Sequence, residues 1–137
     1  MIKLIVGVKG TGKTKALIQD VNDATLNSKG SVVCVEYGRK LGFEIKPQAR
    51  LIDAQLFGIR DEASFYGFIC GIFAGNYDVT DLFIDSALKI CGDDLYAFEK
   101  FILGLDSVMD KTINCVILAS TEPEKIPDSI KKFMVSF

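Results

Sequence analysis

The chain lacks histidine and tryptophan, and its four cysteines contain no C-x-x-C pair. Without histidine, a Ser-His-Asp triad is excluded, and the usual partners for cysteine in a zinc site are missing. The cysteines are far apart and lie in or beside apolar segments, so we expect buried free thiols. They are Cys34, Cys70, Cys91 and Cys115.

Long apolar runs and a surplus of positive charge are also missing. No uninterrupted apolar run approaches the ~20 residues that a membrane-spanning helix needs. Residues 1–3 lead directly into the first apolar segment, so we expect no signal peptide and a soluble, cytoplasmic protein. The net charge of −2 does not indicate nucleic-acid binding. A length of 137 residues predicts one domain, residues 1–137.

The most informative stretch is Gly7-Val8-Lys9-Gly10-Thr11-Gly12-Lys13-Thr14, which fits the pattern G-x-x-x-x-G-K-[ST]. An apolar run precedes it and a helical pattern follows it, which is the context that gives this pattern physical meaning. An ordinary glycine-rich turn would not explain the Lys-Thr pair. We therefore expect Lys13 to reach the β- and γ-phosphates of a nucleoside triphosphate and Thr14 to bind Mg²⁺. The expected phosphate-binding residues are Gly7, Lys9, Gly10, Thr11, Gly12, Lys13, Thr14 and Lys15.

A second site-forming element is Leu82-Phe83-Ile84-Asp85, an apolar segment that ends in an acid. Ligands of an open parallel sheet gather at the carboxyl ends of its strands. A carboxylate in this position suits Mg²⁺ bound through water, so Asp85 is the expected second metal residue. An aspartate that only caps a helix or turn is the structural alternative.

Elsewhere, dense apolar segments alternate with patterns of helical spacing, which predicts a doubly wound α/β domain. Residues 43–60 carry the weakest pattern, and Leu51-Ile52 is an optional small strand. A helix begins near Asp61, and another is capped by Asp93 or Asp94. The main strands are expected at residues 2–6, 31–36, 82–85, 112–119 and 132–137.

The loop at 7–14, Asp85 and the strand ending in Ser120-Thr121 together resemble the P-loop NTPase superfamily, in its additional-strand (AAA+/RecA-like) class. Residues 117–127 are similar to the sensor-1 region of clamp-loader-like AAA+ ATPases. The resemblance implies a three-layer α/β/α fold whose mainly parallel five-stranded sheet has the order 5-1-4-3-2. It also implies ATP and Mg²⁺ as ligands. Ser120, with Thr121 second, would contact the γ-phosphate, so the catalytic candidates are Lys13, Ser120 and Thr121.

Two departures from that family bear on the activity. Ser86 stands where the relatives carry a water-polarising glutamate, and Ser129-Ile130-Lys131-Lys132 stands where they carry an arginine finger. Because such groups strongly accelerate hydrolysis, we expect weak or partner-dependent ATPase activity. A protein partner or self-association is therefore expected.

Two alternatives to this ATPase stay open. One is a nucleotide-gated switch or assembly subunit that hydrolyses nothing. The other is a small-molecule or nucleoside kinase, which would draw on the arginines Arg39, Arg50 and Arg60.

Overall fold

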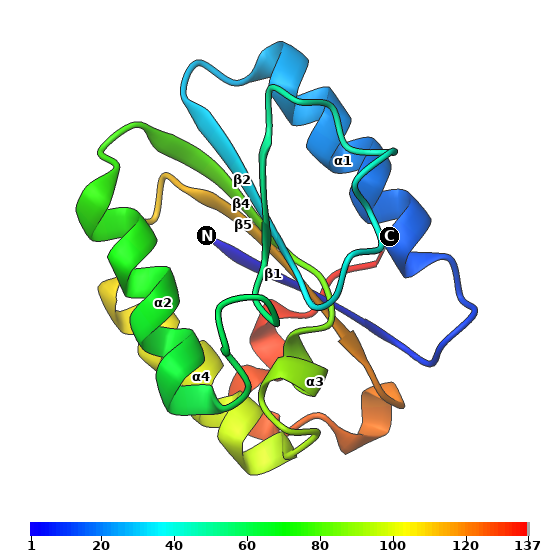
Figure 1. Cartoon of the computed structure of the whole chain (residues 1–137). Helices are drawn as coiled ribbons and strands as arrows, with labels where there is room; N and C mark the ends of the chain where they lie inside the picture. The colour runs from blue at the N-terminus through cyan, green and yellow to red at the C-terminus, as the bar shows by residue number, and fades with distance from the viewer. Residues whose placement is uncertain (137) are drawn as a thin grey trace.

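The computed structural model describes residues 1–136 and contains a five-stranded parallel sheet between layers of helices (Figure 1). Strands and helices alternate along most of the chain. The strands are β1 (Ile2–Gly7), β2 (Ser31–Glu36), β3 (Arg50–Asp53), β4 (Val79–Ile84) and β5 (Asn114–Ser120). The helices are α1 (Lys13–Asn27), α2 (Glu62–Gly75), α3 (Ala87–Ile90) and α4 (Leu95–Val108), followed by the 3₁₀ turns η1 (Pro123–Lys125) and η2 (Asp128–Phe133). The expected α/β class is confirmed.

The helices cover both faces of the sheet, with α1 on one side and α2 and α4 on the other (Figure 1). Consecutive residues of β2 show why. Val32 and Cys34 pack in the core beneath α1, whereas Val33 and Val35 pack in the core beneath α2 and α4. Side chains of a strand alternate between its two faces, so a strand buried on both sides needs an unbroken apolar run. This is the reason that the dense segment at 31–36 predicts a strand correctly.

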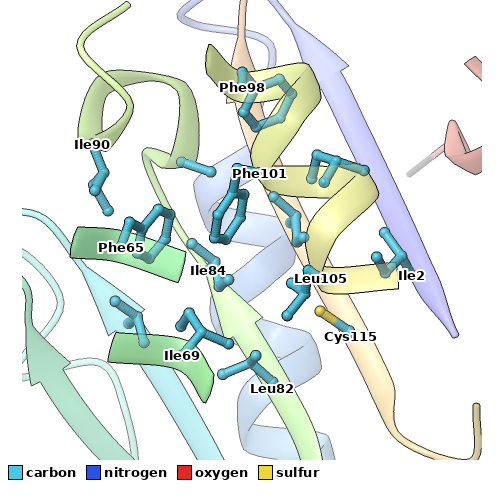
Figure 2. Packing of buried hydrophobic residues seen from close by; sticks show 14 of the residues in the cluster. Ile2, Phe65, Ile69, Leu82, Ile84, Ile90, Phe98, Phe101, Leu105 and Cys115 are labelled. Carbon is cyan, nitrogen blue, oxygen red and sulfur yellow. The ribbon is translucent and has the colours of Figure 1, made fainter. Parts of the chain in front are cut away.

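The larger core lies between the sheet and the pair α2–α4 (Figure 2). Its centre is a stacked pair, Phe65 and Phe101, whose ring centroids lie 4.3 Å apart with an interplanar angle of 4°. Ile69 of α2 and Leu105 of α4 extend the contact toward Cys115 of β5. The aromatic residues of α2 therefore serve packing, as their helical spacing indicates.

The predicted strand order is wrong at both edges of the sheet. The observed order is β1-β5-β4-β2-β3, so β1, β5, β4 and β2 follow the expected sequence of neighbours, but no strand flanks β1 on its outer side within residues 1–136. Residues 128–133 instead form η2, and the segment 132–136 contributes one isolated bridge between Leu4 and Met134. Phe137 lies outside the described residues.

Local and tertiary causes explain this difference. Pro127 caps η2, and its carbonyl accepts a hydrogen bond from the Ile130 N–H at 3.1 Å. Ile130 of that turn is fully buried, which anchors the segment as a turn. At the opposite edge, the optional strand at Leu51-Ile52 forms as β3, in parallel register with Cys34 and Val35 of β2.

Smaller expectations are also settled by the structure. The segment 86–92 is more than a linker, because it contains α3. Asp61 and Asp94 cap α2 and α4 with side-chain hydrogen bonds. All four cysteines are free: three are buried and Cys70 is half-buried. No helix within residues 1–136 is long and apolar enough to cross a membrane.

Candidate functional site

The loop between β1 and α1 has the backbone that its glycines allow. Gly10 and Gly12 have φ angles of 86° and 87°, in the left-handed region that other residues rarely adopt. Gly12 is also the N-cap of α1, and no side chain caps this end of the helix. The first N–H groups of α1 are thus left for another acceptor, and the helix dipole favours an anion there.

Lys13 and Thr11 hold this loop in shape from within. The Lys13 ammonium donates to the Val8 carbonyl at 3.0 Å, and the Thr11 hydroxyl donates to the same carbonyl at 2.9 Å. A Cβ atom at Gly7 would lie 3.0 Å from Thr11 Oγ1 and 3.6 Å from Lys13 Cδ, so a side chain there would fill the loop. Lys13 is buried, and burial lowers the pKa of its ammonium, while the nearby Asp85 charge raises it.

Asp85 follows β4 directly at the carboxyl edge of the sheet. Its N–H donates to the Val35 carbonyl at 2.8 Å, which ties it to the end of β2. The side chain is buried, and this burial raises the pKa of its carboxyl group. The positive charge of Lys40, a backbone hydrogen bond from Ser86 and the charge of Lys13 act in the opposite direction. Asp85 therefore lies among cations although it forms no ion pair within 4.0 Å in residues 1–136.

One cavity of about 310 Å³ joins these elements. Ser120 reaches it because β5 lies beside β1 and pairs Ser120 with Gly7 in register. Thr121 does not line the cavity, so only the first of the two sensor candidates is brought to it. Gly7 and Thr11, two of the predicted phosphate-binding residues, do not line it either. The lining residues are Lys9, Gly10, Gly12, Lys13, Thr14, Lys15, Lys40, Leu41, Asp85, Ser86 and Ser120.

Two of these residues, Lys40 and Leu41, were not predicted from the sequence. They lie in the segment after β2, whose pattern is too irregular to place. A sequence signal exists in retrospect: Glu36 ends an apolar strand, and a buried carboxylate needs partners. Its Oε1 accepts hydrogen bonds from the Lys40 and Leu41 N–H groups, at 2.9 and 3.0 Å.

The cavity has few chemical groups that could activate water. Asp85 is the only carboxylate among its lining residues in the described chain. Ser86 also lines it, in a left-handed conformation with φ 59° and ψ 34°. Glu36 and Asp53 line a neighbouring hollow of about 780 Å³, together with Arg39 and Arg50. None of the three arginines, Arg39, Arg50 and Arg60, lines the cavity of about 310 Å³.

The residues present fit a magnesium-bound triphosphate in charge and in chemistry. Lys9, Lys13, Lys15 and Lys40 supply positive charge, and the loop glycines leave the cradle free of side chains. Mg²⁺ is usually bound by one or two protein oxygens, with phosphates and water completing its shell. Thr14 and Asp85 carry such oxygens. Within residues 1–136, no cluster of three or more His, Cys, Asp or Glu residues could hold a metal ion by itself.

Comparison with known proteins adds no relative: no protein-family model and no curated protein sequence matches the chain.

Proposed function

We propose that this protein binds Mg-ATP in the cavity between the 7–14 loop, Asp85 and Ser120, and that it hydrolyses ATP slowly or only with a partner. The observation that carries the proposal is the convergence of Lys13, Thr14, Asp85 and Ser120, from three separate parts of the chain, on one cavity at the start of a helix. A simple glycine-rich turn would not need a buried lysine or a buried acid beside it.

The position of β5 between β1 and β4 supports the assignment to the additional-strand class of P-loop NTPases. It separates the loop strand from the strand that precedes Asp85, and it is the strand that delivers Ser120. The edges of the sheet differ from the arrangement that the resemblance implies, so the proposal rests on the order β1-β5-β4-β2 and on the cavity.

In this proposal each residue has a defined part. Loop and helix N–H groups bind phosphate oxygens, and Lys13 exchanges its bond with the Val8 carbonyl for phosphate oxygens. Thr14 and Asp85 hold Mg²⁺, Asp85 through water, and the metal neutralises charge between the phosphates. Ser120 donates a hydrogen bond to the γ-phosphate or accepts one from the attacking water.

A non-hydrolysing switch is the second candidate, and the composition of the cavity favours it. Asp85 would be occupied with the metal, and Glu36, which ends the neighbouring strand β2, already accepts two backbone hydrogen bonds. No other lining residue in the described chain can serve as a base for water. Nucleotide would then act by shifting a conformational balance, which requires different affinities for the two conformations.

Calorimetric titration with Mg-ATP, combined with phosphate release in the same samples, tests both candidates. Lys13→Ala should weaken ATP binding by about 10- to 100-fold, the value of a charge-assisted hydrogen bond lost. Lys46→Ala is the matched control, because Lys46 is exposed and does not line the cavity. Unchanged affinity in folded Lys13→Ala would refute the site. Binding without phosphate release would select the switch.

A further inference from the structure

Among the charged residues that line the cavity in the described chain, Lys40 is the one that comes neither from residues 9–15 nor from the end of β4. It belongs to the segment 37–49, which connects β2 to β3 and lies beside α1 (Figure 1). Lys40 and its neighbour Leu41 line the same cavity as Lys13 and Asp85. The cavity is thus closed on one side by a segment that carries its own positive charge.

The backbone of this segment is firmly held at Lys40. The Glu36 carboxylate binds the N–H groups of Lys40 and Leu41, and the Leu41 side chain is buried in the core that also contains Leu17 of α1. Just before it, the Gly38 N–H donates to Asp53 Oδ1 at 2.8 Å, and Gly38 has a φ of 86°. The turn is therefore anchored to β2, β3 and α1 together.

The same segment is fixed a second time farther along. The Asn22 side chain of α1 donates to the Glu44 carbonyl at 2.8 Å and accepts from the Lys46 N–H at 2.9 Å. Ile45 and Ala49 are buried in the core beneath α1. Since α1 begins at the phosphate loop, this clamp sets the distance between the segment and the loop.

The Lys40 ammonium, by contrast, has no directly bonded partner within residues 1–136. It takes part in no ion pair and no side-chain hydrogen bond within residues 1–136. Lys13 differs, because it is buried and bonded inside the loop. A lysine with a fixed backbone and an unpaired ammonium group is well arranged to bind an anion, because its backbone needs no further ordering.

Resting on the proposed function, we propose that Lys40 contacts the γ-phosphate and makes the cavity prefer ATP over ADP. Lys40 shares the cavity wall with Asp85 and Ser86. A metal held by Asp85 and Thr14 would neutralise charge on the outer phosphates of a triphosphate, so the terminal phosphate would lie near this wall. ADP has no phosphoryl group there, so it gains nothing from the Lys40 charge.

The test compares Mg-ATP and Mg-ADP affinities by calorimetry in the full chain. Lys40→Met keeps the length of the side chain and removes its charge, and Lys46→Met is the matched control from the same segment. We expect Lys40→Met to weaken Mg-ATP binding about tenfold, the low end for a charge-assisted hydrogen bond, and to change Mg-ADP affinity less than about twofold. Lys46→Met should change neither affinity, and Lys40→Arg should retain most of the preference.

Three outcomes would overturn the inference. Lys40→Met could leave Mg-ATP affinity unchanged, or it could weaken Mg-ATP and Mg-ADP equally, which would indicate general attraction of anions. The third outcome is a wild-type chain that binds neither nucleotide, which would also overturn the proposed function and is thereby distinguishable from the first two. Melting curves without nucleotide verify that each variant is folded, and Lys40→Gln provides a second neutral variant.

Discussion

Burial of Asp85 disfavours the ionised carboxylate, which is the form that its proposed role as a metal residue requires. Its pKa is raised mainly by desolvation, which means that the folded state favours the protonated carboxyl. A raised folded-state pKa makes the unliganded protein gain stability as the pH falls through that pKa. At neutral pH the ionised side chain is therefore a cost to folding.

Asp85→Asn should consequently raise the melting temperature of the nucleotide-free protein at neutral pH, while it reduces the dependence of ATP binding on Mg²⁺. Asparagine has a similar shape and needs no desolvation of a charge. Melting curves measured from pH 7 downward check the first part, and the difference from wild type should shrink as the pH falls.

Titrations with and without Mg²⁺ check the second part. Asp128→Asn is the control, because the Asp128 side chain is 95% exposed. A lower melting temperature for Asp85→Asn at neutral pH, or unaltered Mg²⁺ dependence, would contradict the assignment of Asp85 as a functional residue kept at a cost in stability.

At the scale of elements, the contact between α2 and α4 holds one whole layer of the molecule. Phe65 and Phe101 stack at its centre, and both rings are essentially inaccessible to solvent (Figure 2). Helices of this length depend on such packing, since isolated helices are marginal in water.

Phe101→Ala should lower the free energy of unfolding by about 3–5 kcal/mol, because it removes a buried ring and leaves a cavity. Urea denaturation followed by circular dichroism measures this loss. Tyr96→Ala on the same helix is the control: Tyr96 is 76% exposed, and its replacement should change stability by less than about 0.5 kcal/mol. Equal effects of the two substitutions would refute the packing role.

Helices and strands are predictable from the sequence where the local spacing of apolar residues matches the burial observed in the fold. Asp61 and Asp94 predict the starts of α2 and α4, and the spacing of Phe65 and Ile69 predicts a buried helix face. The strand predicted at 132–137 does not form within residues 132–136, although the apolar residues there suit a strand equally well. Its conformation depends on Ile130, whose burial is a tertiary contact.

For the whole molecule, ligand binding and stability are linked. A ligand that binds only the folded state stabilises it by about 2.7 kcal/mol at a free concentration of 100 times Kd. For a domain of this size, we expect saturating Mg-ATP to raise Tm by several degrees. Differential scanning fluorimetry measures the shift.

At the same Mg-ATP concentration, the Lys13→Ala variant should show about half of this shift or less, while its ligand-free transition is retained. An equal shift in wild type and Lys13→Ala would place the nucleotide elsewhere, and the hollow beside Arg39 and Arg50 would be the next site to examine.

The sequence by itself determined the local units: a strand, a glycine loop and a helix at residues 2–27, an acid directly after an apolar strand, and alternation of the two element types. These follow from backbone preferences and from the period of apolar residues, which act over a few positions. They were sufficient to name most of the residues that line the cavity, including Lys13, Thr14 and Asp85.

Only the tertiary structure decided which strands occupy the edges and which side chains reach the cavity. An edge strand is held from one side, so β3 pairs with β2 while the segment after η2 makes a single bridge to β1. Thr121 lies outside the cavity and Lys40 inside it because strand register and the bonds of Glu36 place them there. Such contacts join residues distant in the chain, and no local pattern encodes them.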